Sequence, residues 1–138
     1  MRTAVALSLL AMLAAPLSGC GRETRHDVRI SVEEIASIAA EGSLMADDLS
    51  NGRTKTTFVR VHGNDLSSQA QHEAEKLNDA PIDPDLDARR QRAIVLAGDI
   101  GGAIDDMRVS PQDRTQARDS EQKLQQWADE ASKIAESM

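Results

Sequence analysis

The sequence predicts an all-α protein whose main domain is an antiparallel, up-and-down four-helix bundle. Four segments carry apolar or small residues at alternating intervals of three and four positions, which is the spacing of one face of a helix. Short stretches with asparagine, glycine or proline separate the segments, and short connections make neighbouring helices antiparallel. No segment shows the sustained apolar–polar alternation with turn signals that is typical of a β-hairpin.

The first helix is expected over residues 31–50. Ser31 and Glu34 have the spacing of a capping box, which marks a helix N-terminus. The predicted core face of this helix consists of Ile35, Ile38, Gly42, Met45 and Leu49. Asn51 and Gly52 then supply a C-terminal stop and a tight reversal.

The second helix is expected from Thr56 to Asp79, because Ala80-Pro81 ends it. Its core face consists of Val59, Gly63, Leu66, Ala70, Ala74 and Leu77. This apolar stripe is thin, and Gly63 lowers helix stability by about 1 kcal/mol relative to alanine.

The third helix is predicted to open at Asp83-Pro84, an N-cap residue followed by proline at the first helical position. Its core face consists of Leu86, Ala93, Ala97, Ile100, Ile104 and Met107. Three glycines, Gly98, Gly101 and Gly102, lie within this helix. They indicate either a bend or the close approach of a neighbouring helix, and we favour close approach.

The fourth helix is predicted to open in the same way, at Ser110-Pro111. Its core face consists of Ala117, Ser120, Leu124, Trp127, Ala131, Ile134 and Met138. Because Trp127 is the only tryptophan and lies in the middle of this stripe, we expect it to be a buried anchor of the core. A three-helix core with the first helix loosely attached is the alternative architecture.

The N-terminal residues have the organisation of a signal peptide. Met1-Arg2-Thr3 is followed by an uncharged run from Ala4 to Leu17, which is shorter than the roughly 20 residues that span a bilayer. Leu17-Ser18-Gly19-Cys20 follows, and this sequence resembles the lipobox of bacterial lipoproteins at all four positions. The resemblance covers residues 1–20 only. It implies cleavage between Gly19 and Cys20, a diacylglyceryl group on the Cys20 sulfur, and acylation of the new amine.

These observations divide the chain into three parts. Residues 1–19 are a signal peptide that is removed, residues 20–30 are the lipidated cysteine and a polar tether, and residues 31–138 are the helical bundle. An Asp after the cysteine would resemble an inner-membrane retention signal. Gly21 stands there instead, which favours the periplasmic face of the outer membrane. In a Gram-positive cell, the corresponding place is the outer face of the cell membrane.

Composition excludes several classes of protein. The aromatic residues are only Phe58 and Trp127, and the formal net charge is −7, so base stacking and phosphate binding are disfavoured and no nucleic-acid partner is expected. Cys20 is the only cysteine, which excludes a disulfide framework and a cysteine-based zinc site.

Motifs that carry chemistry are weak in this sequence. A di-iron site in a four-helix bundle needs Glu-x-x-His on two facing helices, and this motif does not occur. His72 and Glu73 have the right types in reversed order, and the position of His72 predicts that it faces water. Because nucleophile and phosphate-binding motifs are also missing, we expect no metal, no cofactor and no enzymatic activity.

Arg89, Arg90 and Arg92 form one basic cluster, which could receive an acidic partner or a phosphate. Acidic residues shortly before it can neutralise it. Three aspartates further along the same helix, Asp99, Asp105 and Asp106, are interpreted as a solvated face.

The sequence therefore favours a non-catalytic envelope lipoprotein, held in the membrane by acyl chains on Cys20. Its bundle would bind an envelope protein as an adaptor, assembly factor or inhibitor. The alternative is a four-helix lipoprotein that carries a small ligand or metal between its helices, where Gly42, Gly63, Gly98 and Gly101 would leave room for it.

Overall fold

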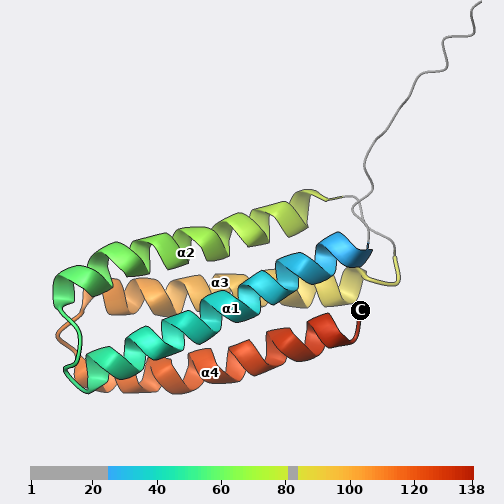
Figure 1. The fold of residues 1–138 in the computed structure, drawn as a ribbon. Coiled ribbons are helices and arrows are strands. Elements are labelled where there is room, and N and C mark those ends of the chain that lie inside the picture. Colours follow the sequence, from blue (N-terminus) through green and yellow to red (C-terminus); the bar gives the residue numbers. More distant parts are fainter. Residues whose placement is uncertain (1–24, 81–83) are drawn as a thin grey trace, which may run out of the picture.

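The computed structural model describes residues 25–80 and 84–138, which form a four-helix bundle (Figure 1). The helices are α1 (Arg25–Ser50), α2 (Thr56–Asp79), α3 (Asp87–Val109) and α4 (Arg114–Glu136). At a rise of 1.5 Å per residue, each helix is about 35 Å long or slightly longer. Consecutive helices run antiparallel, and no strand occurs in the described residues. The predicted all-α, up-and-down bundle is confirmed.

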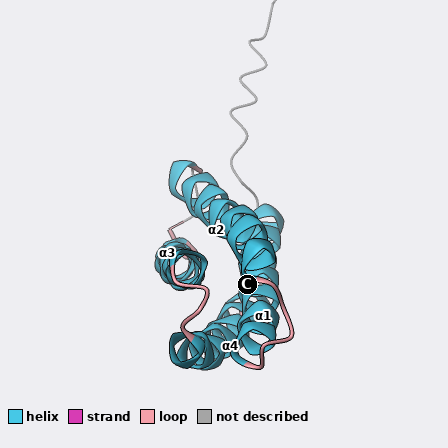
Figure 2. Cartoon of the chain, turned by 90° about the vertical axis from the view of Figure 1, so that its left-hand side faces the viewer, coloured by secondary structure: helices cyan, strands magenta, loops and turns pink. Residues whose placement is uncertain are grey.

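The bundle consists of two closely packed helix pairs. The most extensive contacts join α1 to α4 and α2 to α3, whereas the contacts of α1 with α2 and of α3 with α4 are smaller. In cross-section, α1 and α3 approach each other across one diagonal, while α2 and α4 lie at opposite ends of the other (Figure 2). The first helix is therefore an integral part of the core, and the alternative with a loosely attached first helix is wrong.

Small residues lie where α1 faces α4. The buried positions of α1 include Ala39, Gly42, Ser43 and Ala46. Those of α4 include Ala117, Ser120, Ala128, Ala131 and Ala135. The distance between two packed helices depends on the side chains at the contact, so these residues let the two backbones approach closely. The Ser43 hydroxyl accordingly donates across the interface to the backbone carbonyl of Glu121 at 3.3 Å.

The first helix begins at Arg25, not at Ser31, so the predicted capping box is wrong. Ser31 is fully buried inside the helix, and its hydroxyl has no hydrogen-bond partner among residues 25–80 and 84–138. Val28 and Val32 continue the apolar face toward the N-terminus, and both are fully buried. Burial of this extra turn outweighs the local capping signal, and the part of the predicted tether from Arg25 onward is helical.

The reversal after α1 is as predicted. Gly52 has a positive φ of 70°, and its amide donates to the carbonyl of Leu49 at 3.1 Å. Arg53 then bonds the carboxylates of Asp47 and Asp48, the latter at 2.9 Å from Nε. The second helix also has the predicted bounds, Thr56–Asp79.

The third and fourth helices start later than predicted. Residues 84–86 form a turn and α3 begins at Asp87, while Asp83 lies outside the described residues. Ser110 and Pro111 precede α4, whose N-cap is Asp113. The Asp113 carboxylate accepts from the amides of Thr115 and Gln116 at 3.0 and 2.9 Å. One carboxylate thus satisfies two amides that have no partner inside the helix, which favours this start over the proline signal.

The core face of α4 is centred differently from the prediction in its second half. Trp127 and Ile134 are only partly buried, whereas Ala128 and Ala135 are buried. The expected role of Trp127 as a fully buried anchor is therefore wrong. Alanine occupies the close contact because the helix spacing leaves no room for an indole there.

The structure predicts different costs for truncating neighbouring residues of α4. Leu124 is fully buried, so Leu124→Ala should lower the free energy of unfolding by about 2–4 kcal/mol. Trp127→Ala should cost less, about 1–2 kcal/mol, because the indole is only partly buried and packs at the edge of the core. Denaturant titration followed by circular dichroism measures both values. Gln125→Ala on the exposed face is the control and should change stability by less than about 0.5 kcal/mol. A larger loss for Trp127→Ala than for Leu124→Ala would contradict this packing.

Candidate functional site

The predicted basic cluster is engaged in contacts within the fold. Arg90 closes the C-terminal end of α2, where Nη1 donates to the backbone carbonyls of Leu77, Asn78 and Ala80 at 3.2, 3.3 and 3.3 Å. Its other nitrogens bond the Asp87 carboxylate. Arg89 donates to the carbonyl of Asp85 at 3.3 Å. Arg90 therefore caps the C-terminal end of α2. Binding of an acidic partner or a phosphate by Arg89, Arg90 and Arg92 stays a prediction.

Arg92 connects α3 to α4. Its Nε and Nη2 donate to the two carboxylate oxygens of Glu130 at 2.6 and 2.9 Å, which is a bidentate pair. The hydrogen bonds from Arg92 hold the pKa of Glu130 below its usual range. This pair is the ionic link between two helices that otherwise share only a small contact.

Of the three histidines, His62 makes contacts with neighbouring side chains, and His26 and His72 are exposed. His62 Nε2 lies 2.8 Å from Glu41 Oε1 on α1, and the ring of Phe58 stacks on the imidazole with 4.9 Å between centroids. His72 is exposed, as predicted from its position on the helix. Among the residues that the structure describes, no three His, Cys, Asp or Glu side chains lie close enough to hold a metal ion.

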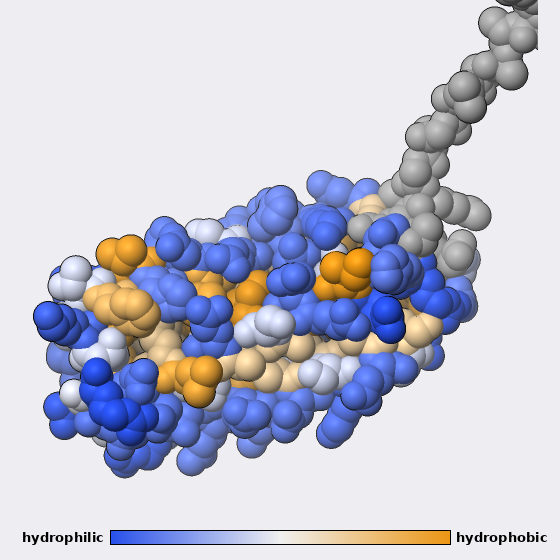
Figure 3. Space-filling view, in the orientation of Figure 1, coloured by the Kyte–Doolittle hydropathy of each residue, from blue (hydrophilic) through white to orange (hydrophobic). Residues whose placement is uncertain are grey.

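Three large apolar side chains are exposed where α1 ends and α2 begins. Leu44 lies in the last two turns of α1, and Phe58 and Val61 lie in the first two turns of α2. Leu44 and Val61 are 69% and 62% exposed, and Phe58 is half-exposed. Figure 3 shows apolar side chains gathered toward this end of the molecule. We call Leu44, Phe58 and Val61 the α1–α2 apolar patch. Exposed apolar clusters of this kind are typical of protein interfaces.

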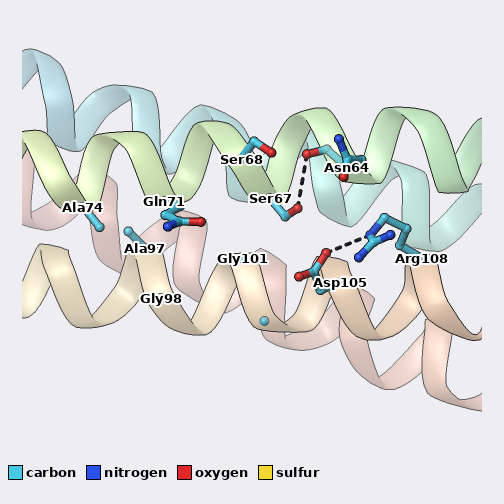
Figure 4. Close-up of a pocket in the computed structure, with 11 residues that line it drawn as sticks. Asn64, Ser67, Ser68, Gln71, Ala74, Ala97, Gly98, Gly101, Asp105 and Arg108 are labelled. Atoms are coloured by element: carbon cyan, nitrogen blue, oxygen red, sulfur yellow. Dashed lines mark hydrogen bonds and ion pairs between the residues drawn. The ribbon is translucent and has the colours of Figure 1, made fainter.

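Two open grooves flank α3 on the other side of the molecule. The groove between α2 and α3 has a volume of about 460 Å³, and its α2 wall is formed by Asn64, Ser67, Ser68 and Gln71 (Figure 4). On its α3 side, Asp105 pairs with Arg108 at 2.9 Å. The groove is therefore polar, with nearly balanced charge.

The groove between α3 and α4 has a volume of about 560 Å³ and is acidic. Four carboxylates line it, those of Asp99, Asp106, Asp113 and Asp119, and Lys123 is its one cationic side chain. Trp127 lies along the same groove, which explains its partial exposure. Gly98 and Gly102 border both grooves, so the two grooves meet over α3.

Sequence reasoning found the α3 residues of these grooves but not their α4 neighbours. Asp99 and Asp106 were interpreted as a solvated face, and they do lie at the surface. Asp113 and Asp119 complete the acidic wall only because one particular face of α4 turns toward α3. The periodicity of α4 predicts that this face is the polar side of the helix. The sequence does not indicate that this polar side lies next to α3.

The interior has little free space beside two of the glycines. A Cβ atom on Gly42 would lie 3.0 Å from Ile104 Cδ1, and one on Gly63 would lie 3.5 Å from Arg108 Cβ. Gly42 and Gly63 therefore leave no space for a ligand between the helices. Open space occurs beside Gly98, which lies on the surface.

Comparisons of the chain with protein-family models, with curated proteins and with solved structures found no match. Its function is therefore argued from its own residues.

None of the described helices is long and apolar enough to cross a membrane. The lipobox residues Leu17, Ser18, Gly19 and Cys20 lie outside the described residues.

The Arg92–Glu130 pair predicts a pH dependence of stability. Because the pKa of Glu130 is lowered in the folded state, its carboxylate stabilises the fold above the pKa of the unfolded chain. That stabilisation is lost as the pH falls through the lowered pKa. Glu130→Gln should therefore lower the Tm at neutral pH, and the difference from wild type should shrink as the pH falls below about 4.3.

Thermal melts at several pH values test this expectation. Arg92→Gln is the matched variant. The double variant should lose about as much stability as either single variant and not the sum of the two losses, because both changes remove the same pair. Additive losses, or a difference that grows in acid, would contradict the assignment.

Proposed function

We propose that this chain is a lipid-anchored lipoprotein of the bacterial envelope whose helical bundle binds another envelope protein. The observation that carries the proposal is the four-residue lipobox, Leu17-Ser18-Gly19-Cys20, directly after an uncharged run of signal-peptide length. Two or three acyl chains make a stable anchor, because each buried methylene contributes about 0.8 kcal/mol.

The position of the bundle on this anchor supports a binding role. Helix α1 begins at Arg25, so at most about 17 Å of chain separates the start of the bundle from Cys20. The α1–α2 apolar patch lies toward the opposite end of helices about 35 Å long. The three side chains of the α1–α2 apolar patch are therefore held away from the anchored end of the bundle, where another protein can reach them.

Replacement of the lipidated residue tests the anchor. Cys20→Ser removes the thiol that accepts the diacylglyceryl group, so the fatty-acid label should disappear and the protein should remain a precursor or be cleaved elsewhere. The measurements are metabolic labelling with a fatty-acid analogue and the intact mass of the membrane-extracted protein. Ser18→Ala is the matched control, since the lipobox accepts alanine there, and it should be processed normally. An unmodified wild-type protein in the soluble fraction would contradict the anchor.

Site-specific photocrosslinking in the native envelope tests the binding role. A benzoylphenylalanine is placed on one exposed position of each helix, at Leu44, Val61, Val95 and Gln125. We expect a second envelope protein to be crosslinked at one or more of these positions. This adduct should be missing from the Cys20→Ser variant. Recovery of only the uncrosslinked chain from all four positions would contradict the binding role.

A further inference from the structure

Helix α3 has a second face, mostly of apolar and small residues, and none of the other three described helices covers it. Its core face packs against the other three helices, yet the opposite, exposed side carries Ala88, Val95, Gly98, Gly102 and Val109 at helical spacing, with Gln91 as the polar residue among them. Val95 is 51% exposed and Val109 is 67% exposed. In an amphipathic helix at the surface of a protein, the side opposite the core is normally polar. This solvent-facing stripe, the outer face of α3, is therefore an unpartnered helix face.

The glycines of this face have no function inside the fold. A Cβ atom on Gly42, Gly63 or Gly101 would meet atoms of neighbouring helices within 4 Å, so packing accounts for those glycines. A Cβ atom on Gly98 or Gly102 would meet nothing within 4 Å. Each of these two residues nevertheless lowers helix stability relative to alanine. What they provide is bare backbone at the surface, which a second helix can approach closely.

The shape around the outer face fits an elongated partner. The grooves on both sides of α3 share Gly98 and Gly102, so the two hollows meet across the bare backbone of α3, and we call the combined surface the trough. Side chains of α2 form one wall and side chains of α4 form the other. A helix lying along α3 would sit between these walls and cover Val95 and Val109.

Charge determines the kind of helix that fits. The α4 side of the trough is acidic, and the carboxylates of Asp106 and Asp119 form no ion pair or hydrogen bond within residues 25–80 and 84–138. A second copy packed antiparallel would bring the same acidic wall against itself, and a parallel copy would set that wall against the nearly neutral α2 side. An anionic membrane surface would be repelled. A helix with basic side chains along one edge would pair with these carboxylates.

We propose that a basic amphipathic helix of a protein partner packs along the outer face of α3, over Gly98 and Gly102, with its cationic side chains against Asp106 and Asp119. The proposal rests on the proposed function and names the chemistry of the partner. Small or apolar residues of the partner would meet the glycine backbone and the two valines.

Photocrosslinking at Val95 and at Leu44 separates this surface from the α1–α2 apolar patch. The expected result is an adduct at Val95 whose attached peptide, sequenced by mass spectrometry, is a helix-forming segment with net positive charge. An adduct at Leu44 and none at Val95 would overturn this proposal and leave the proposed function standing. An adduct with twice the mass of the chain would identify a second copy as the occupant and would also overturn it. The absence of adducts at all positions would contradict the proposed function itself.

Substitutions then test the contacts. Gly98→Leu should reduce the yield of the Val95 adduct by about tenfold or more, since a large side chain prevents close approach of the partner helix. Asp106→Asn with Asp119→Asn should reduce the yield about fivefold, and added salt should have a similar effect on the wild type. Asp65→Asn and Asp129→Asn, on exposed positions outside the trough, are the matched controls and should leave the yield unchanged.

Thermal stability distinguishes lost binding from lost folding. Gly98→Ala should raise the Tm by a few degrees, because the added methyl meets nothing and the helix gains stability. Gly42→Ala should lower it, because Ile104 and Leu124 lie within 3.3 Å of the new atom. A lower Tm for Gly98→Ala, or an unchanged adduct yield in Gly98→Leu, would overturn the assignment of this face.

Discussion

The packing of α1 against α4 is the contact on which the rest of the bundle depends. It joins the first and the last helix, so it closes the longest loop in the chain, and the entropy cost of that closure must be offset by close contact. Alanine, glycine and serine supply this contact by bringing the two backbones together. At the end of this interface, Arg25 donates to the backbone carbonyl of Met138 at 3.0 Å. The α2–α3 pair packs against the surface that the α1–α4 pair presents.

Much of the architecture could be predicted because helical periodicity records burial directly. The core faces of α1, α2 and α3 agree with the predicted stripes, and α2 has the predicted bounds. The errors concern helix starts and the second half of the α4 core face, where Trp127 and Ile134 are only partly buried. Ser31 carries a valid local signal, but burial of Val28 and Val32 stabilises an earlier start, and Asp113 caps α4 more effectively than Ser110-Pro111. Local signals compete with packing partners that lie elsewhere in the chain, and the sequence does not state which helices become neighbours.

The same reason limits prediction of the candidate surfaces. Arg90 and Arg92 form a basic cluster in the sequence, yet in the fold one caps α2 and the other bonds Glu130 of α4. Gly98, Gly101 and Gly102 form one group in the sequence, yet only Gly101 lies against another helix. A difference of one position along a helix is a rotation of 100°, so adjacent glycines have unrelated environments. Only the assembled bundle separates the residues that the fold uses from those that it leaves open.

The early start of α1 restricts where a molecule anchored at Cys20 can act. Only four residues stand between Cys20 and Arg25, the first residue of α1, so the proposed lipid anchor would hold the bundle in a thin layer next to the bilayer. Confinement to such a layer raises the effective concentration toward other proteins of the same membrane and lowers it toward proteins that diffuse freely. A modest intrinsic affinity is then sufficient for a membrane-bound neighbour, and a distant protein must diffuse to the membrane to be bound.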